Sequence, residues 1–99
     1  MRLGVHRVRG LSMTPNFLHD DYVLIFRWRF SRYRPGDVVV VRHPSLGTII
    51  KRIVERDAQG RLLLAGDNPA STDSASIGWQ SPDRLLGAVW WRLTPRRFS

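Results

Sequence analysis

The segment GTIIKRIVE, residues 47–55, has the composition of a β-strand, yet it carries a lysine at its centre. Side chains alternate across a strand, so Ile49, Lys51 and Ile53 are expected to share one face. Lys51 is also the only lysine, because fifteen of the sixteen Lys and Arg residues are arginine. If the isoleucines bury it, the amine tends to lose its proton and becomes a competent general base. The alternative is an edge strand, from which the lysine stem carries a charged amine out to water.

Runs of β-branched and bulky residues on either side of this segment predict further strands. Each run is bounded by Gly, Pro, Asp or Asn, the residues that favour turns. The predicted strands cover residues 22–26, 37–41, 48–54 and 61–65, and LLGAVWWRL, residues 85–93, forms a closing strand. Only the segment after Ser12 has the composition for a short helix. The 99 residues are therefore predicted to form one domain, residues 1–99, with a mostly-β, coiled or barrel-like sheet.

Composition excludes several kinds of site. The chain has no cysteine, so disulfides, thiolate metal sites and a cysteine nucleophile are excluded. His6, His19 and His43 do not have metal-ligand spacing, and no metal or other cofactor is predicted. A Ser-His-Asp triad that uses one of these histidines stays open as an alternative. The net charge of +8 favours an anionic partner, such as nucleic acid, a lipid surface or an acidic protein.

The sequence shows no segment that would span a membrane. Its apolar runs, such as VVVV at residues 38–41, fall far short of the roughly 18 to 20 residues that a spanning helix needs. The N-terminal MRLGVHRVRG has no apolar core of the kind found in a secretory signal. We therefore expect a soluble, cytoplasmic protein, with peripheral contact to an anionic membrane surface as a further option.

A candidate nucleophile precedes the strands in RGLSMTPNF, residues 9–17. Gly10 allows a tight turn before Ser12, and Pro15 prevents a strand from running through this segment. A serine at the mouth of a turn can use backbone N–H groups to hold an oxyanion, and a Ser-Lys pair is a variant of the serine-protease arrangement. A lone serine more commonly caps a helix. Sequence spacing alone does not bring Ser12 and Lys51 together.

A third polar segment, GDNPASTDSASIG at residues 66–78, follows the fourth predicted strand. Its small polar residues fit a solvated loop of Asx and Ser turns. The functional interpretation is a loop whose hydroxyl groups orient the lysine amine and whose aspartate braces the loop.

The order of the blocks GLSMTP, DDYVLI, RPGDVVVV, IIKRIV, GDNPASTDS and GAVWW resembles the type I signal peptidase family of Ser-Lys proteases. The resemblance covers nearly the whole chain, from residue 10 to about residue 95. Within that family, the small size and the GLSMTP start look most like the maturation proteases of nickel-type superoxide dismutase. Those enzymes remove a short N-terminal extension and so free the residues that bind nickel.

The resemblance implies a role for each residue that matches a motif. Ser12 would be the nucleophile and Lys51 the general base. Met13 and Pro15 match residues that shape the substrate groove. The backbone N–H of Ser12 would stabilise the oxyanion that forms when the serine attacks a peptide carbonyl.

The same resemblance assigns roles in the loop and marks two departures. Ser71 would bond the lysine amine, although a one-residue shift would give that role to Thr72. Asp73 would be a structural acid of the loop. Gly10 stands where many bacterial signal peptidases place an oxyanion-hole hydroxyl, and Asp20 stands where a glycine is usual.

The predicted function is that of a soluble serine endopeptidase that removes an N-terminal extension from a precursor protein, with nickel-type superoxide dismutase as the candidate substrate. One alternative is a membrane-associated enzyme like the signal peptidases. A LexA-like self-cleaving domain is disfavoured, because only eleven residues precede Ser12. FRWRFSRYR, residues 26–34, alternates arginine with aromatic residues, so a basic β-barrel that binds nucleic acid without catalysis is another alternative. Nucleic acid is nevertheless the less favoured partner.

Overall fold

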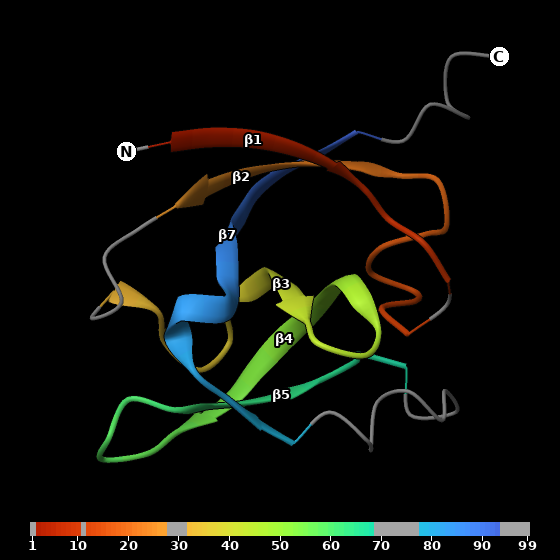
Figure 1. Cartoon of the computed structure of the whole chain (residues 1–99). Coiled ribbons are helices and arrows are strands. Elements are labelled where there is room, and N and C mark those ends of the chain that lie inside the picture. The colour runs from red at the N-terminus through yellow and green to blue at the C-terminus, as the bar shows by residue number, and fades with distance from the viewer. Residues whose placement is uncertain (1, 11, 28–31, 69–77, 94–99) are drawn as a thin grey trace, which may run out of the picture.

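One antiparallel sheet organises the chain in the computed structural model, which describes residues 2–10, 12–27, 32–68 and 78–93 (Figure 1). Across the sheet the strand order is β1-β2-β7-β3-β4-β5-β6. The strands are β1 (Arg2–Arg7), β2 (Tyr22–Arg27), β3 (Val38–His43), β4 (Gly47–Arg56), β5 (Leu62–Ala65), β6 (Trp79–Gln80) and β7 (Leu85–Leu93). The 3-10 helix η3 (Pro82–Arg84) precedes β7, and the described residues contain no α-helix. The mostly-β prediction is confirmed.

Five of the strands follow the sequence predictions closely. β7 begins and ends where predicted, and β2, β3, β4 and β5 differ from the predicted ranges by one or two residues at their ends. The strands β1 and β6 were not predicted. The segment after Ser12 forms turns instead of a helix, with a backbone bond from Phe17 N–H to the Met13 carbonyl at 2.9 Å.

β7 joins the two halves of the coiled sheet. Its C-terminal part pairs with β2 through residues 88–93, and its N-terminal part pairs with β3 through residues 85–88. Figure 1 shows β7 running from the β1–β2 ribbon to the β3–β5 layer. Gly87 lies in this crossing region, where a Cβ on this residue would come within 2.7 Å of the Phe26 carbonyl oxygen. Glycine is therefore what permits β2 and β7 to approach so closely.

Two apolar clusters lie on opposite faces of the central strands. Alternate residues of β3 and β4 supply both clusters, as expected for strands that are covered on both sides. One cluster, here called the β5 core, comprises Tyr33, Val39, Val41, Ile53, Leu62, Leu64, Leu85 and Ala88, with Ile49 packed against it. The other, here called the β2 core, comprises Val8, Met13, Val23, Ile25, Val38, Val40 and Ile50.

Lys51 is buried on β4, one residue before the pairing of β4 with β5 begins. Its strand, β4, pairs with β3 on one side and β5 on the other, and Lys51 is opposite Val39. Ile49 and Ile53, its neighbours on the same face, both pack in the β5 core. Lys51 is 2% exposed, so the edge-strand alternative, in which the amine extends to water, is wrong.

Exposed apolar side chains gather on β1, β2 and β7. β7 has one more residue than β2 between Val89 and Trp91, and this bulge contains Trp90. The Trp90 ring meets the Phe26 ring edge-on at 5.2 Å between centroids. The exposed set on these strands is Leu3, Val5, Tyr22, Trp90, Trp91 and Leu93. Within the described ranges, no helix is long and apolar enough to cross a membrane.

Candidate active site

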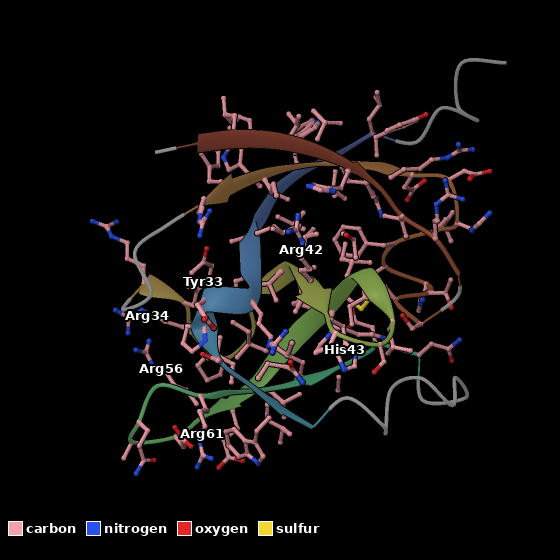
Figure 2. The ribbon with its side chains drawn as sticks, viewed as in Figure 1. Tyr33, Arg34, Arg42, His43, Arg56 and Arg61 are labelled. Atoms are coloured by element: carbon pink, nitrogen blue, oxygen red, sulfur yellow. The ribbon has the colours of Figure 1, made fainter. Side chains whose placement is uncertain are left out.

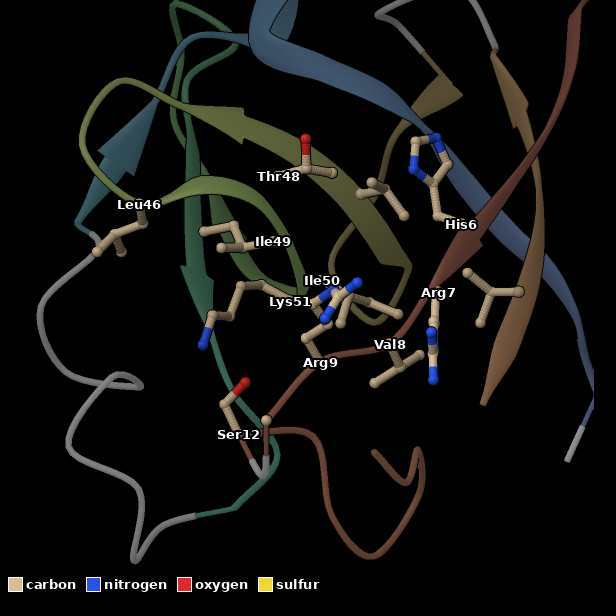
Figure 3. A pocket seen from close by; sticks show the side chains of 13 residues that line it. His6, Arg7, Val8, Arg9, Ser12, Leu46, Thr48, Ile49, Ile50 and Lys51 are labelled. Atoms are coloured by element: carbon tan, nitrogen blue, oxygen red, sulfur yellow. The ribbon is translucent and has the colours of Figure 1, made fainter. Parts of the chain in front are cut away.

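A pocket of about 330 Å³ lies between the end of β1 and the beginning of β4 (Figure 3). The β1 side contributes His6, Arg7 and Val8, and the β4 side contributes residues 48–51. Ser12 and Lys51 both line this pocket, although they are far apart in the sequence. The fold therefore places the predicted nucleophile and the predicted base beside one cavity.

The orientation of these two side chains is visible in Figure 3. The Lys51 amine and the Ser12 hydroxyl point toward the same end of the pocket. Lys51 is 2% exposed and Ser12 is 8% exposed, so both are largely withdrawn from water. Burial disfavours an ammonium relative to a neutral amine. A buried amine and a buried hydroxyl that face one space are the two groups that a Ser-Lys dyad needs.

The turn that carries Ser12 is held by backbone hydrogen bonds at both ends. The N–H of Gly10 donates to Nδ1 of His19 at 2.9 Å. Gly10 has φ +82°, in the left-handed region that glycine adopts without strain. On the other side, the N–H of Asn68 donates to the Ser12 carbonyl at 2.8 Å. The backbone of Ser12 is thus attached to the segment that follows β5.

The segment after β5 is attached to the Ser12 turn by side chains as well. Nδ2 of Asn68 donates to Oγ1 of Thr14 at 3.0 Å. Nδ2 of Asn16 donates to Oδ2 of Asp67 at 2.9 Å. Asp67 and Asn68 therefore connect β5 to both halves of the turn that begins at Ser12.

Arg52 completes this network from β4, on the sheet face opposite to Lys51. Its Nε and Nη2 donate to the two carboxylate oxygens of Asp67, each at 2.8 Å, and its Nη1 donates to the Gly36 carbonyl at 2.7 Å. This bidentate geometry is the strong form of a guanidinium–carboxylate pair. It links the strand that carries the candidate base to the turn that carries the candidate nucleophile.

The pair perturbs the proton affinity of both partners. Hydrogen bonds from the Arg52 side chain lower the pKa of Asp67, with a further bond from Asn16, although desolvation opposes them. In return, the hydrogen bond to Asp67 raises the pKa of Arg52 against the effect of desolvation. The ion pair is therefore fully charged at neutral pH.

The other predicted site residues fall into two groups. Met13 is 1% exposed and packs in the β2 core, and Pro15 is exposed, so neither lines the pocket. Ser71 and Asp73 lie outside the described residues, as does the alternative Thr72. Roles in substrate contact and lysine orientation for these residues stay predictions.

The sequence did not single out the residues that brace the Ser12 turn. Asp67 and Asn68 were noted only as part of a polar loop, and the bracing role was assigned to Asp73. The available signal was GDN directly after a strand, because Asp and Asn bond to nearby backbone and to loops. The pattern did not identify Arg52 as the partner of Asp67, because Arg52 lies on another strand.

The three histidines have different surroundings. In the part of the chain that the structure describes, no three His, Asp or Glu side chains gather closely enough to hold a metal ion. His6 lines the pocket, whereas His19 and His43 each accept backbone N–H groups at Nδ1.

Comparison with known proteins gives one finding. Residues 2–83 match the family model described as Peptidase S24-like. No curated protein and no solved structure gave a significant match. The matched range includes Ser12 and Lys51, the candidate nucleophile and the candidate base.

Proposed function

The chain belongs to the Peptidase S24-like family, and from that premise we propose that it is a serine endopeptidase in which Ser12 is the nucleophile and Lys51 the general base. Family membership supports a serine peptidase-type function in general. The specific assignment is carried by one observation: a serine and the chain's only lysine, both buried, line the same pocket.

Proton transfer in this site would proceed between these two side chains. The neutral Lys51 amine accepts the Ser12 hydroxyl proton as Oγ forms a bond to the scissile carbonyl carbon. The resulting ammonium then gives that proton to the leaving amine when the C–N bond breaks, which leaves an ester on Ser12. The amine next takes a proton from water, whose oxygen attacks the ester, and returns it to Oγ. Each cycle thus restores both groups.

The surroundings of the pair suit this chemistry. Burial of Lys51 favours the neutral form that a base must have. Bonds from Asn68 and to His19 limit the movement of the Ser12 backbone, and a fixed N–H at the nucleophile is the donor that an oxyanion hole requires. Arg52 holds the bracing segment from a strand position next to Lys51.

Cleavage of a peptide library tests the proposal without knowledge of the substrate. A proteome digest is incubated with the protein, and new N-termini are identified by mass spectrometry. The Ser12→Ala change should lower their formation by about 10³-fold or more. Lys51→Met keeps a similar apolar stem and should lower it by about 10²- to 10⁴-fold.

A matched control removes a different hydroxyl. Ser45 lies exposed between β3 and β4, so Ser45→Ala should cleave like the natural sequence. If Ser12→Ala or Lys51→Met, folded as judged by circular dichroism, also cleaves normally, the dyad assignment is wrong.

For the substrate, we propose a precursor protein that loses an N-terminal extension, with nickel-type superoxide dismutase as the candidate. This choice rests on the resemblance of GLSMTP and the later blocks to the maturation proteases of that enzyme. Incubation with a precursor of nickel-type superoxide dismutase should yield a product shortened at its N-terminus, as measured by intact mass. If the precursor stays intact while library peptides are cleaved, the substrate assignment is wrong and the peptidase assignment stands.

A further inference from the structure

The rows of side chains that build the β2 core end in arginine at one edge. On β2, Val23 and Ile25 are buried and the next residue on their face is Arg27. On β3, Val38 and Val40 are buried and the next residue on their face is Arg42. Both arginines are exposed. The apolar layer therefore gives way to positive charge at this edge.

These two arginines and a third share a hollow. Arg27, Arg42 and Arg84 line a pocket of about 530 Å³ together with Asp83, Leu85 and Leu86. They come from three different elements, β2, β3 and η3. None of the ion pairs found between described residues includes any of the three arginines. The pocket thus presents three guanidinium groups and one carboxylate, with an aliphatic wall.

This arginine pocket adjoins the candidate active site through one pair of residues. Val40 and Ile50 lie opposite each other on β3 and β4, and both line the pocket that holds Ser12 and Lys51. The next pair on the same sheet face is Arg42 with Thr48. Thr48 still lines the active-site pocket, whereas Arg42 lines the arginine pocket. The two pockets therefore come together at the pair formed by Thr48 and Arg42.

The spacing of the two pockets matches a short stretch of extended peptide. Lys51 and Thr48 are three residues apart on β4, which is about 10 Å at the rise of a β-strand. An extended substrate has the same rise per residue. The residue about three positions from the scissile bond would then lie beside Arg42.

We propose that the arginine pocket binds an acidic side chain of the substrate, about three residues from the bond that is cut. The inference rests on the proposed peptidase function and adds a preference for Asp or Glu at that place. Guanidinium groups bind carboxylates in a two-pronged geometry, and Leu85 and Leu86 can contact the methylene groups of a glutamate.

The chemistry of the pocket favours a peptide over nucleic acid. Three arginines beside one carboxylate suit one or two anionic groups better than a long polyanion. The pocket also continues the sheet face on which Thr48 and Ile50 line the candidate active-site pocket. Binding of an oligonucleotide at the same arginines is the competing outcome that the experiment includes.

Binding to the Ser12→Ala protein tests the preference apart from catalysis. The probes are fluorescein-labelled decapeptides rich in Ala and Ser, with a Glu three residues before or after the central peptide bond. Their counterparts carry Gln instead, and binding is followed by fluorescence anisotropy. One of the two Glu peptides should bind about 10-fold more tightly than its Gln counterpart.

Two charge-matched variants locate the effect. Arg42→Gln should abolish the advantage of the Glu peptide. Arg61→Gln removes the same charge on the β4–β5 hairpin, about 27 Å away along β4 by strand geometry, and should keep the advantage. Figure 2 shows Arg61 at that hairpin, well separated from Arg42.

The outcomes separate this inference from the peptidase assignment. Equal binding of Glu and Gln peptides overturns the acidic preference, as does an equal loss of the Glu advantage in both variants, which would indicate diffuse charge. Tighter binding of a ten-nucleotide oligothymidine that depends on Arg42 overturns it in favour of nucleic acid. Library cleavage is scored separately, so a peptidase without the preference and a binding site without peptidase activity give different results.

Discussion

At the scale of single residues, two charged side chains on one strand have opposite surroundings. Lys51 is buried on the β5-core face of β4, whereas Arg52 lies on the other face in an ion pair with Asp67. Alternation along β4 predicted this division from the sequence, but it left open whether Lys51 is buried between Ile49 and Ile53 or reaches water from an edge strand. The pairing of Arg52 with Asp67 could not be predicted from the sequence, because it depends on which loop packs beside β4.

The Arg52–Asp67 pair should make stability depend on pH. Because the pKa of Asp67 is lowered in the folded state, its carboxylate stabilises the fold fully above the ordinary aspartate pKa of about 3.9. That stabilisation is lost as the pH falls through the lower, folded-state value. Asp67→Asn should therefore lower the free energy of unfolding by about 1 to 2 kcal/mol at pH 7, and by much less near pH 2.

Urea unfolding at both pH values measures this difference. Glu55→Gln is the control, because Glu55 is exposed on the same strand as Arg52 and should change the unfolding free energy by less than about 0.5 kcal/mol. If Asp67→Asn lowers the free energy of unfolding by the same amount at pH 7 and at pH 2, the charge of Asp67 does not contribute to stability.

At the scale of elements, the strands rich in β-branched residues were predictable and the polar ones were not. β3 and the centre of β4 are buried on both faces, so their runs of Val and Ile gave a strong signal. β1 has the reverse pattern, because Leu3 and Val5 are exposed while Gly4 and His6 are turned inward. An inward glycine and histidine do not look like a core face. β6 has only two residues, too few for any period.

Also at this scale, a side-chain hydrogen bond joins the Ser12 turn to the segment after β5. Thr14 and Asn68 are joined by a hydrogen bond of 3.0 Å. We expect Asn68→Ala and Thr14→Val each to lower the rate of library cleavage and to lower stability by about 1 kcal/mol. The double variant should be little worse than either single one, because both changes remove the same bond.

Hydrogen exchange of residues 12–17 distinguishes this bracing role from a general loss of stability. Amide exchange should quicken in that turn in both variants and stay unchanged in β3. Effects on cleavage that simply add in the double variant would contradict a shared bond.

At the scale of the whole molecule, β7 determines how the sheet coils. Its pairing with β2 at one end and β3 at the other places the β1–β2 ribbon opposite β4, and the candidate active-site pocket lies between them. The sequence predicted β7 to the residue but could not give its partners, since the strand order does not follow the chain order. For the same reason the meeting of Ser12 and Lys51 came from resemblance and not from spacing.

A substitution at Gly87 tests the close approach of β2 and β7. In Gly87→Ala the new Cβ would lie 2.7 Å from the Phe26 carbonyl oxygen, so backbone must shift. We expect a loss of about 1 to 3 kcal/mol in the free energy of unfolding, measured in urea. Gly4→Ala is the matched control, because its Cβ would meet the Ile25 side chain at 3.1 Å, and that side chain can move. Equal effects of the two changes would contradict the close β2–β7 approach.

The protonation of Lys51 is the most direct test of the proposed dyad. Lysine labelled with ¹³C at Cε and incorporated into the full chain gives one side-chain signal, because Lys51 is the only lysine. Its chemical shift, followed from pH 5 to pH 11, reports the fraction of neutral amine without any need for a substrate. A buried general base is expected to be largely neutral at pH 8. An amine that is still fully protonated at pH 9 would contradict the role of Lys51 as the base.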